Sequence, residues 1–333
     1  MNDVTSILVV LDRSVRDAPL VDKALMLARE LNARIELFSC DADHGYALKH
    51  AYDRRGVEAA RQKCVADLND YLRRLSYVVA AQDVAVSVDV VCESPQYEGI
   101  VHKVFKTCPD LVMKAAASGG AAGSSALDSN DWELVRTCPV PLLLSRGRAW
   151  STRPRFAAAV DVSDEESPRL LQRILRSAAY LSEGCHGELD LVFGERTGAD
   201  ALSEKTHAAK LRTLAQEVQL APERVWRLTG DPATTFPAFA AEQKPDVLVV
   251  GALTHQGRDT GHVGTLTRKL VDALDCDFVL LRPRRFEFPV RKQDGVAGAA
   301  LAGRKSYSSG SRSGTPHCRS CAAQRKDLAH SSR

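Results

Sequence analysis

Short hydrophobic runs alternate with amphipathic segments along the chain. Residues 7–11, Ile-Leu-Val-Val-Leu, form a continuous aliphatic run that ends at Asp12. A continuous run of this length is typical of a strand that is buried on both faces of a parallel sheet. Residues 20–31 then carry apolar side chains at helical spacing, and residues 33–40 return to strand composition. The pattern predicts a strand–helix–strand unit at the start of the chain.

The same alternation continues to about residue 145. Helices are predicted over residues 57–75 and 97–106, and further strands over 84–91, 110–113 and 140–144. Parallel neighbours need long crossover connections, and helices that supply them cover both faces of the sheet. The pattern therefore predicts an α/β fold with a doubly wound, five-stranded parallel sheet.

The order of elements then repeats. The second set of predicted strands covers residues 156–160, 188–193, 225–228, 246–250 and 277–281. Asp161 lies 149 residues after Asp12, whereas Asp246 lies 136 residues after Asp110. An offset that drifts by the length of one loop is expected for two diverged copies of one domain.

The repeat defines the predicted domain organisation. We predict a first domain over residues 1–148, a second over 153–283, and a disordered basic tail over 284–333, where the apolar periodicity stops. The two copies are expected to pack as an internal pseudo-dimer through the strands at 140–144 and 277–281. Whether two or more copies of the chain also form a homo-oligomer is left open.

Composition narrows the class of protein. With 44% hydrophobic and 26% charged residues the chain is typical of globular proteins. It has no apolar run of the about 18 residues that a membrane helix needs, and its N-terminus lacks the layout of a signal peptide. Its nine cysteines are dispersed and odd in number, which favours reduced thiols. We therefore predict a cytoplasmic protein without a membrane partner.

The positive charge is concentrated in the tail. Residues 284–333 hold 11 Lys and Arg against 3 Asp and Glu, so residues 1–283 are net negative although the whole chain is +3. A basic tail can contact nucleic-acid phosphates. Binding to single-stranded nucleic acid also uses aromatic side chains on which bases stack, and apart from Tyr307 the tail has no tyrosine or tryptophan. We therefore interpret the tail as a solvated extension. Nucleic acid is not expected as a partner of the rest of the chain.

The candidate ligand-binding residues of the second copy lie mainly after its fourth strand. In open parallel sheets, ligands bind at the carboxyl ends of the strands. That strand runs into residues 251–264, which contain four glycines, and a helix is predicted directly afterwards. Backbone N–H groups and the helix dipole would face a phosphate there, with Thr265 as a cap or donor. Asp161 would accept from a ribose hydroxyl or a base amine, or would only bond loop amides.

The Asp-terminated first strands and the late glycine loop resemble the universal stress protein family. Its nucleotide-binding members carry Gly-x-x-Gly, nine residues, and Gly-Ser/Thr. Gly251, Thr254, Gly264 and Thr265 keep this spacing, with Thr254 in place of the second glycine. The resemblance implies a fold like that of the adenine nucleotide alpha hydrolases. It also implies a site for ATP or another adenine nucleotide formed by these residues and Asp161.

The resemblance extends over residues 4–283 and is greatest to the tandem, E-type subgroup. Relatives that bind ATP carry an Arg where this chain has Leu253. The first copy has Ala115, Ser118 and Asp128-Ser129 at the motif positions, so a phosphate site is not predicted there.

The resemblance implies a non-catalytic module that binds a small ligand or regulates the response to stress. Two alternatives stay open. One is an enzyme that hydrolyses ATP weakly, with Asp161 or Asp259 beside a Mg²⁺ ion. The other is a structural protein whose own pockets are empty and which binds partner proteins.

No catalytic residue and no metal site are assigned. We interpret His255 and His262 as polar loop residues, and Cys318 and Cys321 lack a second pair of ligands for zinc.

Overall fold

The computed structural model describes residues 4–50, 53–117, 127–163, 167–195, 198, 200–252 and 263–282. The predicted tail, residues 284–333, lies outside the described residues. No described helix combines the length and the apolar character that crossing a membrane requires.

Ten strands and nine α-helices are described, and a short 3-10 helix, η1 (Pro222–Arg224), precedes β8. The first half contains β1 (Ser6–Val10), α1 (Asp17–Leu31), β2 (Arg34–Asp41), α2 (Ala42–His50), α3 (Arg54–Ala80), β3 (Val86–Cys92), α4 (Gln96–Thr107), β4 (Leu111–Ala115), α5 (Ser129–Thr137) and β5 (Leu142–Ser145). The second half contains β6 (Arg155–Ala159), α6 (Pro168–Glu183), β7 (Glu188–Glu195), α7 (Ala201–Glu217), β8 (Val225–Thr229), α8 (Pro232–Gln243), β9 (Val247–Gly251), α9 (Thr265–Ala273) and β10 (Asp277–Leu281). Every predicted strand is present.

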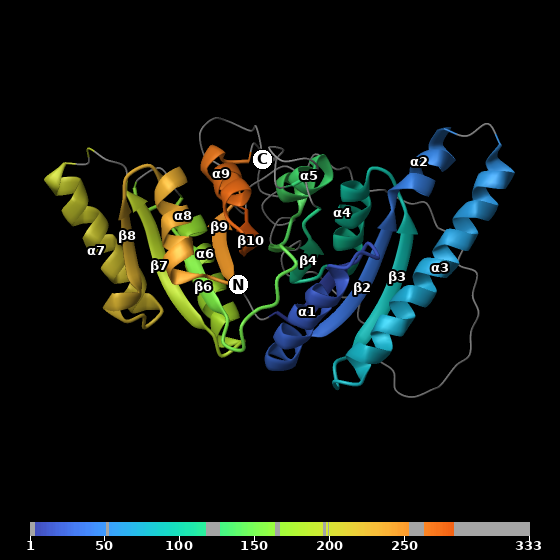
Figure 1. The fold of residues 1–333 in the computed structure, drawn as a ribbon, viewed down its shortest axis with the longest axis horizontal. Helices are drawn as coiled ribbons and strands as arrows, with labels where there is room; N and C mark the ends of the chain where they lie inside the picture. The colour runs from blue at the N-terminus through green and yellow to red at the C-terminus, as the bar shows by residue number, and fades with distance from the viewer. Residues whose placement is uncertain are drawn as a thin grey trace, which may run out of the picture.

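The strands form one sheet in the order β3-β2-β1-β4-β5-β10-β9-β6-β7-β8. All neighbours are parallel except β5 and β10, which pair antiparallel at the centre. Figure 1 shows the two halves extending to either side of this junction. The expected contact through the last strands is confirmed, and it fuses the two predicted five-stranded sheets into one.

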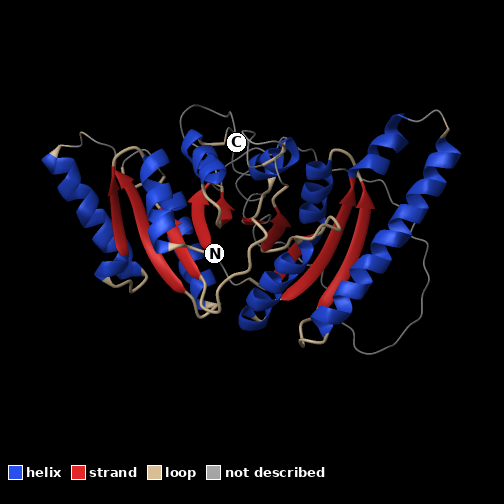
Figure 2. Cartoon of the chain, viewed as in Figure 1, coloured by secondary structure: helices blue, strands red, loops and turns tan. Residues whose placement is uncertain are grey.

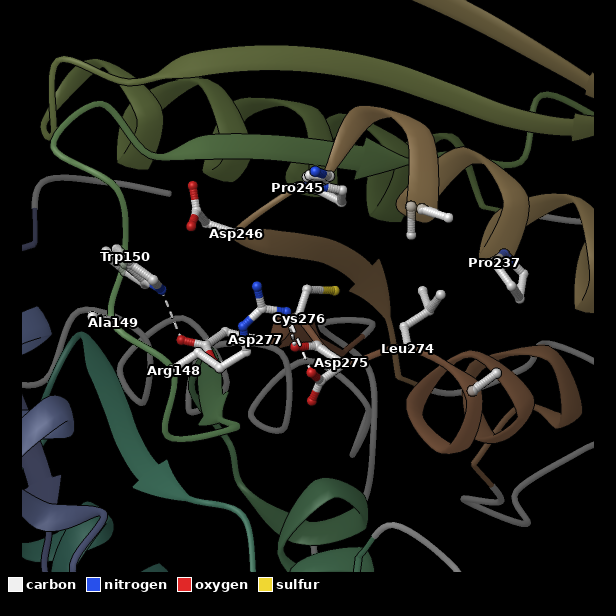
Figure 3. A pocket seen from close by; sticks show the side chains of 14 residues that line it. Arg148, Ala149, Trp150, Pro237, Pro245, Asp246, Leu274, Asp275, Cys276 and Asp277 are labelled. Carbon is white, nitrogen blue, oxygen red and sulfur yellow. Dashed lines mark hydrogen bonds and ion pairs between the residues drawn. The ribbon is translucent and has the colours of Figure 1, made fainter.

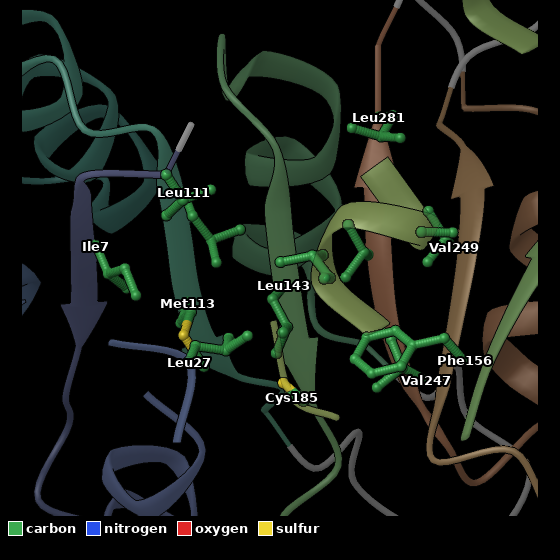
Figure 4. Packing of buried hydrophobic residues seen from close by; sticks show 14 of the residues in the cluster. Ile7, Leu27, Leu111, Met113, Leu143, Phe156, Cys185, Val247, Val249 and Leu281 are labelled. Atoms are coloured by element: carbon green, nitrogen blue, oxygen red, sulfur yellow. The ribbon is translucent and has the colours of Figure 1, made fainter. Parts of the chain in front are cut away.

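Helices cover both faces of the sheet, as Figure 2 shows. Ile7, Leu143 and Val279 belong to the core on the face of α1, α3, α6 and α7, part of which is drawn in Figure 4. Leu8 and Leu142 belong to the opposite core, under α4, α5, α8 and α9. Successive strand residues point to opposite faces. Since both faces are covered, the strands are continuously hydrophobic.

Two arginines after the central strands tie the halves together. Arg146 follows β5 and donates to the carbonyl oxygen of Val271 in α9. Arg282 follows β10 and donates to the carbonyl oxygen of Cys138, 3.0 Å away, at the end of α5. A helix C-terminus leaves carbonyl groups unpaired and favours positive charge. Each half therefore supplies an arginine that pairs with carbonyl groups at the C-terminus of the last helix in the other half.

A buried ion pair crosses the same junction. Lys23 Nζ of α1 lies 2.5 Å from Asp277 Oδ2 at the start of β10, and both side chains are 2% exposed. Ser145 Oγ accepts from Lys23 at 2.7 Å, and Trp150 Nε1 donates to Asp277 at 2.8 Å. Burial lowers the pKa of Lys23 and raises that of Asp277, while their contact opposes both shifts.

Candidate functional site

The predicted site lies where β6 and β9 end side by side in the sheet. The chain order reverses between these two strands, since β7 follows β6 on one side and β9 flanks it on the other. Such a switch point leaves a crevice at the carboxyl edge of the sheet. In the first half the equivalent point lies between β1 and β4.

The end of β9 and the start of α9 are joined by two hydrogen bonds. The N–H of Gly264 donates to the carbonyl oxygen of Ala252 at 3.2 Å. Thr267 Oγ1 donates to the carbonyl oxygen of Gly251 at 2.8 Å in a buried position. The fold therefore brings Gly251, Gly264 and Thr265 together at the junction of β9 and α9.

In the part of the chain that the structure describes, the N-terminus of α9 has no acidic residue and no side-chain cap. Gly264 is the N-cap residue, and Thr265 is exposed on the first turn. The guanidinium carbon of Arg268 lies 4.6 Å from the ring centroid of Trp132 in α5. Arg268 is the fourth residue of α9, and the helix dipole makes the N-terminus of this helix partially positive, which favours an anion there.

Asp161 lies two residues after β6, at the same edge of the sheet. It is half-buried, and its Oδ1 accepts from the N–H of Ser163 at 2.9 Å and from Ser163 Oγ at 2.5 Å. The structure thus shows the turn-forming role that is common for Asp after a strand. These bonds also hold the carboxylate in place at the crevice.

The other predicted site residue, Thr254, lies outside the described residues. So do Leu253, Asp259, His255 and His262, on which the predictions about phosphate contacts, hydrolysis and metal binding depend. Gly264 itself has a φ of −57°, so its backbone does not need the left-handed conformation that glycine tolerates.

The equivalent place in the first half is filled by carboxylates. Lys114 of β4 is buried and lies 2.7 Å from Asp131 Oδ1, while Asp131 Oδ2 accepts from the N–H of Ala117 at 2.7 Å. Asp128 caps α5 by accepting from the N–H of Asp131 at 2.7 Å. These two negative charges occupy the helix end where a phosphate would bind. The sequence signal for this was Lys114, a charge inside an apolar run.

Asp12, the counterpart of Asp161, bonds its own loop. Its Oδ1 accepts from the N–H of Ser14 at 3.0 Å. Burial alone would raise the pKa of Asp12, but its hydrogen bonds with Ser14 and Asp17 and the charge of Lys114 together outweigh burial and lower the pKa. Asp12 is therefore held ionised beside the first-half crevice.

The cavity in Figure 3 lies at the opposite edge of the sheet. It has a volume of about 400 Å³ and is lined by Trp150, the end of α8 and the first residues of β10. Its acidic groups already have structural partners. Asp246 accepts from the N–H of Arg155 and from Ser151 Oγ, both at 2.9 Å, and Asp277 belongs to the buried ion pair. The cavity is separate from the predicted site.

Comparison with known proteins agrees with this architecture. Residues 4–146 match the universal stress protein family. The chain is 21% identical over 310 residues to Universal stress protein E of Photorhabdus laumondii, which covers 87% of this chain and 99% of that protein. It is 22% identical over 308 residues to the protein of the same name from Escherichia coli K12, with 87% and 97% covered. The first half of the chain, residues 4–146, belongs to the universal stress protein family, and both relatives match the chain across its two halves.

The chain also has the fold of solved proteins of this family. A putative universal stress protein from Pseudomonas aeruginosa superposes with a TM-score of 0.67 at 20% identity, over 84% of this chain and 94% of that one. The match spans both halves, so the tandem α/β fold expected from the sequence is confirmed.

Proposed function

We propose that this universal stress protein binds a small phosphate-bearing ligand, with an adenine nucleotide as the first candidate, at the end of β9. The observation that carries the proposal is the contrast between the two helix N-termini. Among the described residues the start of α9 bears no carboxylate, whereas the start of α5 bears Asp128 and Asp131. One site per chain is therefore expected, in the second half.

The proposed contacts follow from the positions of the described residues. First-turn N–H groups of α9, at Thr265 and beyond, would donate to phosphate oxygens. Asp161, held by Ser163, would accept from the ribose or the base. The protein would act as a binding or regulatory module in a stress response, as its family membership suggests, rather than as an enzyme.

A single added charge tests the site. Thr265→Glu places a carboxylate on the exposed first turn of α9, where the helix dipole favours it, so the fold should be retained. A phosphate would meet a like charge, and we expect ATP and AMP to bind at least about tenfold more weakly, which corresponds to about 1.4 kcal/mol. Isothermal titration calorimetry with each nucleotide measures the change.

Ser129→Glu is the matched control, since Ser129 is exposed at the equivalent position of α5. It should leave nucleotide binding unchanged. Equal affinities of the two variants would refute the site, and a wild-type chain that binds neither nucleotide would favour the structural, partner-binding alternative. Phosphate release from ATP with Mg²⁺ that disappears in Thr265→Glu would favour the hydrolase.

A further inference from the structure

Three side chains that the proposed nucleotide site does not use converge at the carboxyl end of β2. Asp41 is the last residue of β2, His44 lies in the first turn of α2, and Cys64 lies on α3. His44 Nδ1 lies 2.7 Å and Cys64 Sγ 2.8 Å from Asp41 Oδ2. One nitrogen, one sulfur and one oxygen all lie within 4.8 Å of one another.

The three atoms are close enough together for one tetrahedral metal ion to bridge them after a small outward movement. Zinc binds sulfur at about 2.3 Å and imidazole nitrogen or carboxylate oxygen at about 2.0–2.2 Å, so its ligand atoms stand about 3.3–3.8 Å apart. Small side-chain rotations would open the present triangle to that size. The donor set also selects the class of metal, because Mg²⁺ and Ca²⁺ prefer oxygen ligands, whereas thiolate and imidazole favour zinc.

The backbone already orients the carboxylate. Asp41 Oδ1 accepts from the N–H groups of Asp43 at 3.0 Å and His44 at 3.2 Å, which turns Oδ2 toward the imidazole and the thiol. Hydrogen bonds of this kind hold metal ligands in position. The His44 side chain is 33% exposed and that of Asp41 11%, so an ion can reach the cluster from solvent.

We propose that Asp41, His44 and Cys64 bind one thiophilic divalent cation of the zinc class, with solvent in the fourth position. On binding, the S–H bond of Cys64 breaks, a sulfur–metal bond forms, and the proton passes to the buffer. The ion would connect β2, α2 and α3 in the half of the molecule that lacks the phosphate site.

Cobalt(II) titration provides the test, because Co²⁺ occupies zinc sites and reports a thiolate ligand by a charge-transfer band. The tail contains Cys318 and Cys321, so the full-length chain is first changed to Cys318→Ser/Cys321→Ser to remove those thiols. In this background we expect one equivalent of Co²⁺ with the sulfur charge-transfer band and the visible bands of tetrahedral cobalt. Added Zn²⁺ should abolish both.

Variants in the same background assign the ligands. Cys64→Ser should remove the charge-transfer band, and His44→Gln, at a partly exposed position, should weaken Co²⁺ binding at least about tenfold, in line with the loss of one ligand. Cys108→Ser removes a thiol outside the cluster and should change neither. The proposal is overturned if the background shows no charge-transfer band, if the band persists in Cys64→Ser, or if His44→Gln binds Co²⁺ as tightly as the background.

Discussion

At the scale of single residues, the two halves differ most where their sequences place charge. Lys114 and Asp131 of the first half correspond to Val250 and Thr267 of the second, 136 residues later. The first pair forms a buried ion pair, while Thr267 bonds the carbonyl oxygen of Gly251. Differences at these two positions, together with Asp128 in place of Gly264, thus separate a helix end that carries carboxylates from one that has none among the described residues.

The pair formed by Lys23 and Asp277 should be the most costly to break. In Lys23→Met, Asp277 keeps its bonds to Trp150 and the N–H of Arg146 but loses its only described buried cation. Removing one partner of a buried pair leaves an uncompensated charge, so we expect the free energy of unfolding to fall by about 3–5 kcal/mol. Urea denaturation followed by circular dichroism measures it.

An exposed pair across the same region provides the comparison. Arg148 and Asp275 lie 3.3 Å apart and are 69% and 80% exposed. Asp275→Asn should cost less than about 1 kcal/mol. Similar losses in the two variants would contradict the argument from burial.

At the scale of elements, charged side chains hold the outer strands of the second half in register. Glu188 of β7 lies 3.3 Å from Arg155 of β6 and accepts a closer bond from Arg224, which precedes β8. Asp190 accepts from Arg224 at 3.1 Å and from Trp226 Nε1 at 3.0 Å. The network links three neighbouring strands at the amino edge of the sheet.

This network predicts an acid-sensitive contribution to stability. The hydrogen bond from Arg224 and the charge of Arg155 lower the pKa of Glu188 below its ordinary value of 4.5. Between the two pKa values the unfolded chain binds more protons, so the contribution is fully present above pH 4.5 and is lost as the pH falls through the lower, folded value.

Glu188→Gln should therefore be less stable than the wild type at pH 7, and the difference should shrink toward zero in acid. Urea unfolding of the variant and the wild type, at pH 7 and at an acidic pH below the folded pKa of Glu188, measures this difference in the free energy of unfolding. Glu217→Gln, on an exposed position of α7, is the control and should match the wild type throughout. A difference that stays constant with pH would show that the charge of Glu188 does not contribute.

At the scale of the whole molecule, the antiparallel pairing of β5 and β10 makes two repeats into one folding unit. Leu143 pairs with Val279 across the junction, and both are fully buried. The core on this face contains residues of both halves, from Val4 to Leu281. Because the apolar surface is shared, neither half can unfold without exposing part of the other.

Leu143→Ala should consequently destabilise both halves. A cavity in a close-packed core costs about 2–5 kcal/mol for this change. With Trp132 and Trp150 replaced by Phe, Trp226 is the single tryptophan of the chain. In this background, circular dichroism and the fluorescence of Trp226, which lies on β8 at the far edge of the second half, should shift together. Leu202→Ala, at a position 75% exposed, should shift neither. A Trp226 transition that stays in place while circular dichroism moves would show that the halves unfold separately.

Much of this architecture was predictable because strands buried on both faces leave an unambiguous pattern. The runs at residues 7–11 and 277–281 are continuous and aliphatic, and the repeat of their order predicted the tandem fold and the central pairing. These features depend on local periodicity, which a sequence records directly.

The long-range polar contacts were decided only by the tertiary structure. Lys23 meets Asp277 from 254 positions away, and Asp41 and Cys64 approach across two elements after 23 positions. No local pattern marks such partners, because a charged or thiol side chain has the same sequence context whether it is paired or solvated. The sequence by itself determined which segments are buried and in what order; folding determined which polar groups meet, because burial forces each one to find a partner.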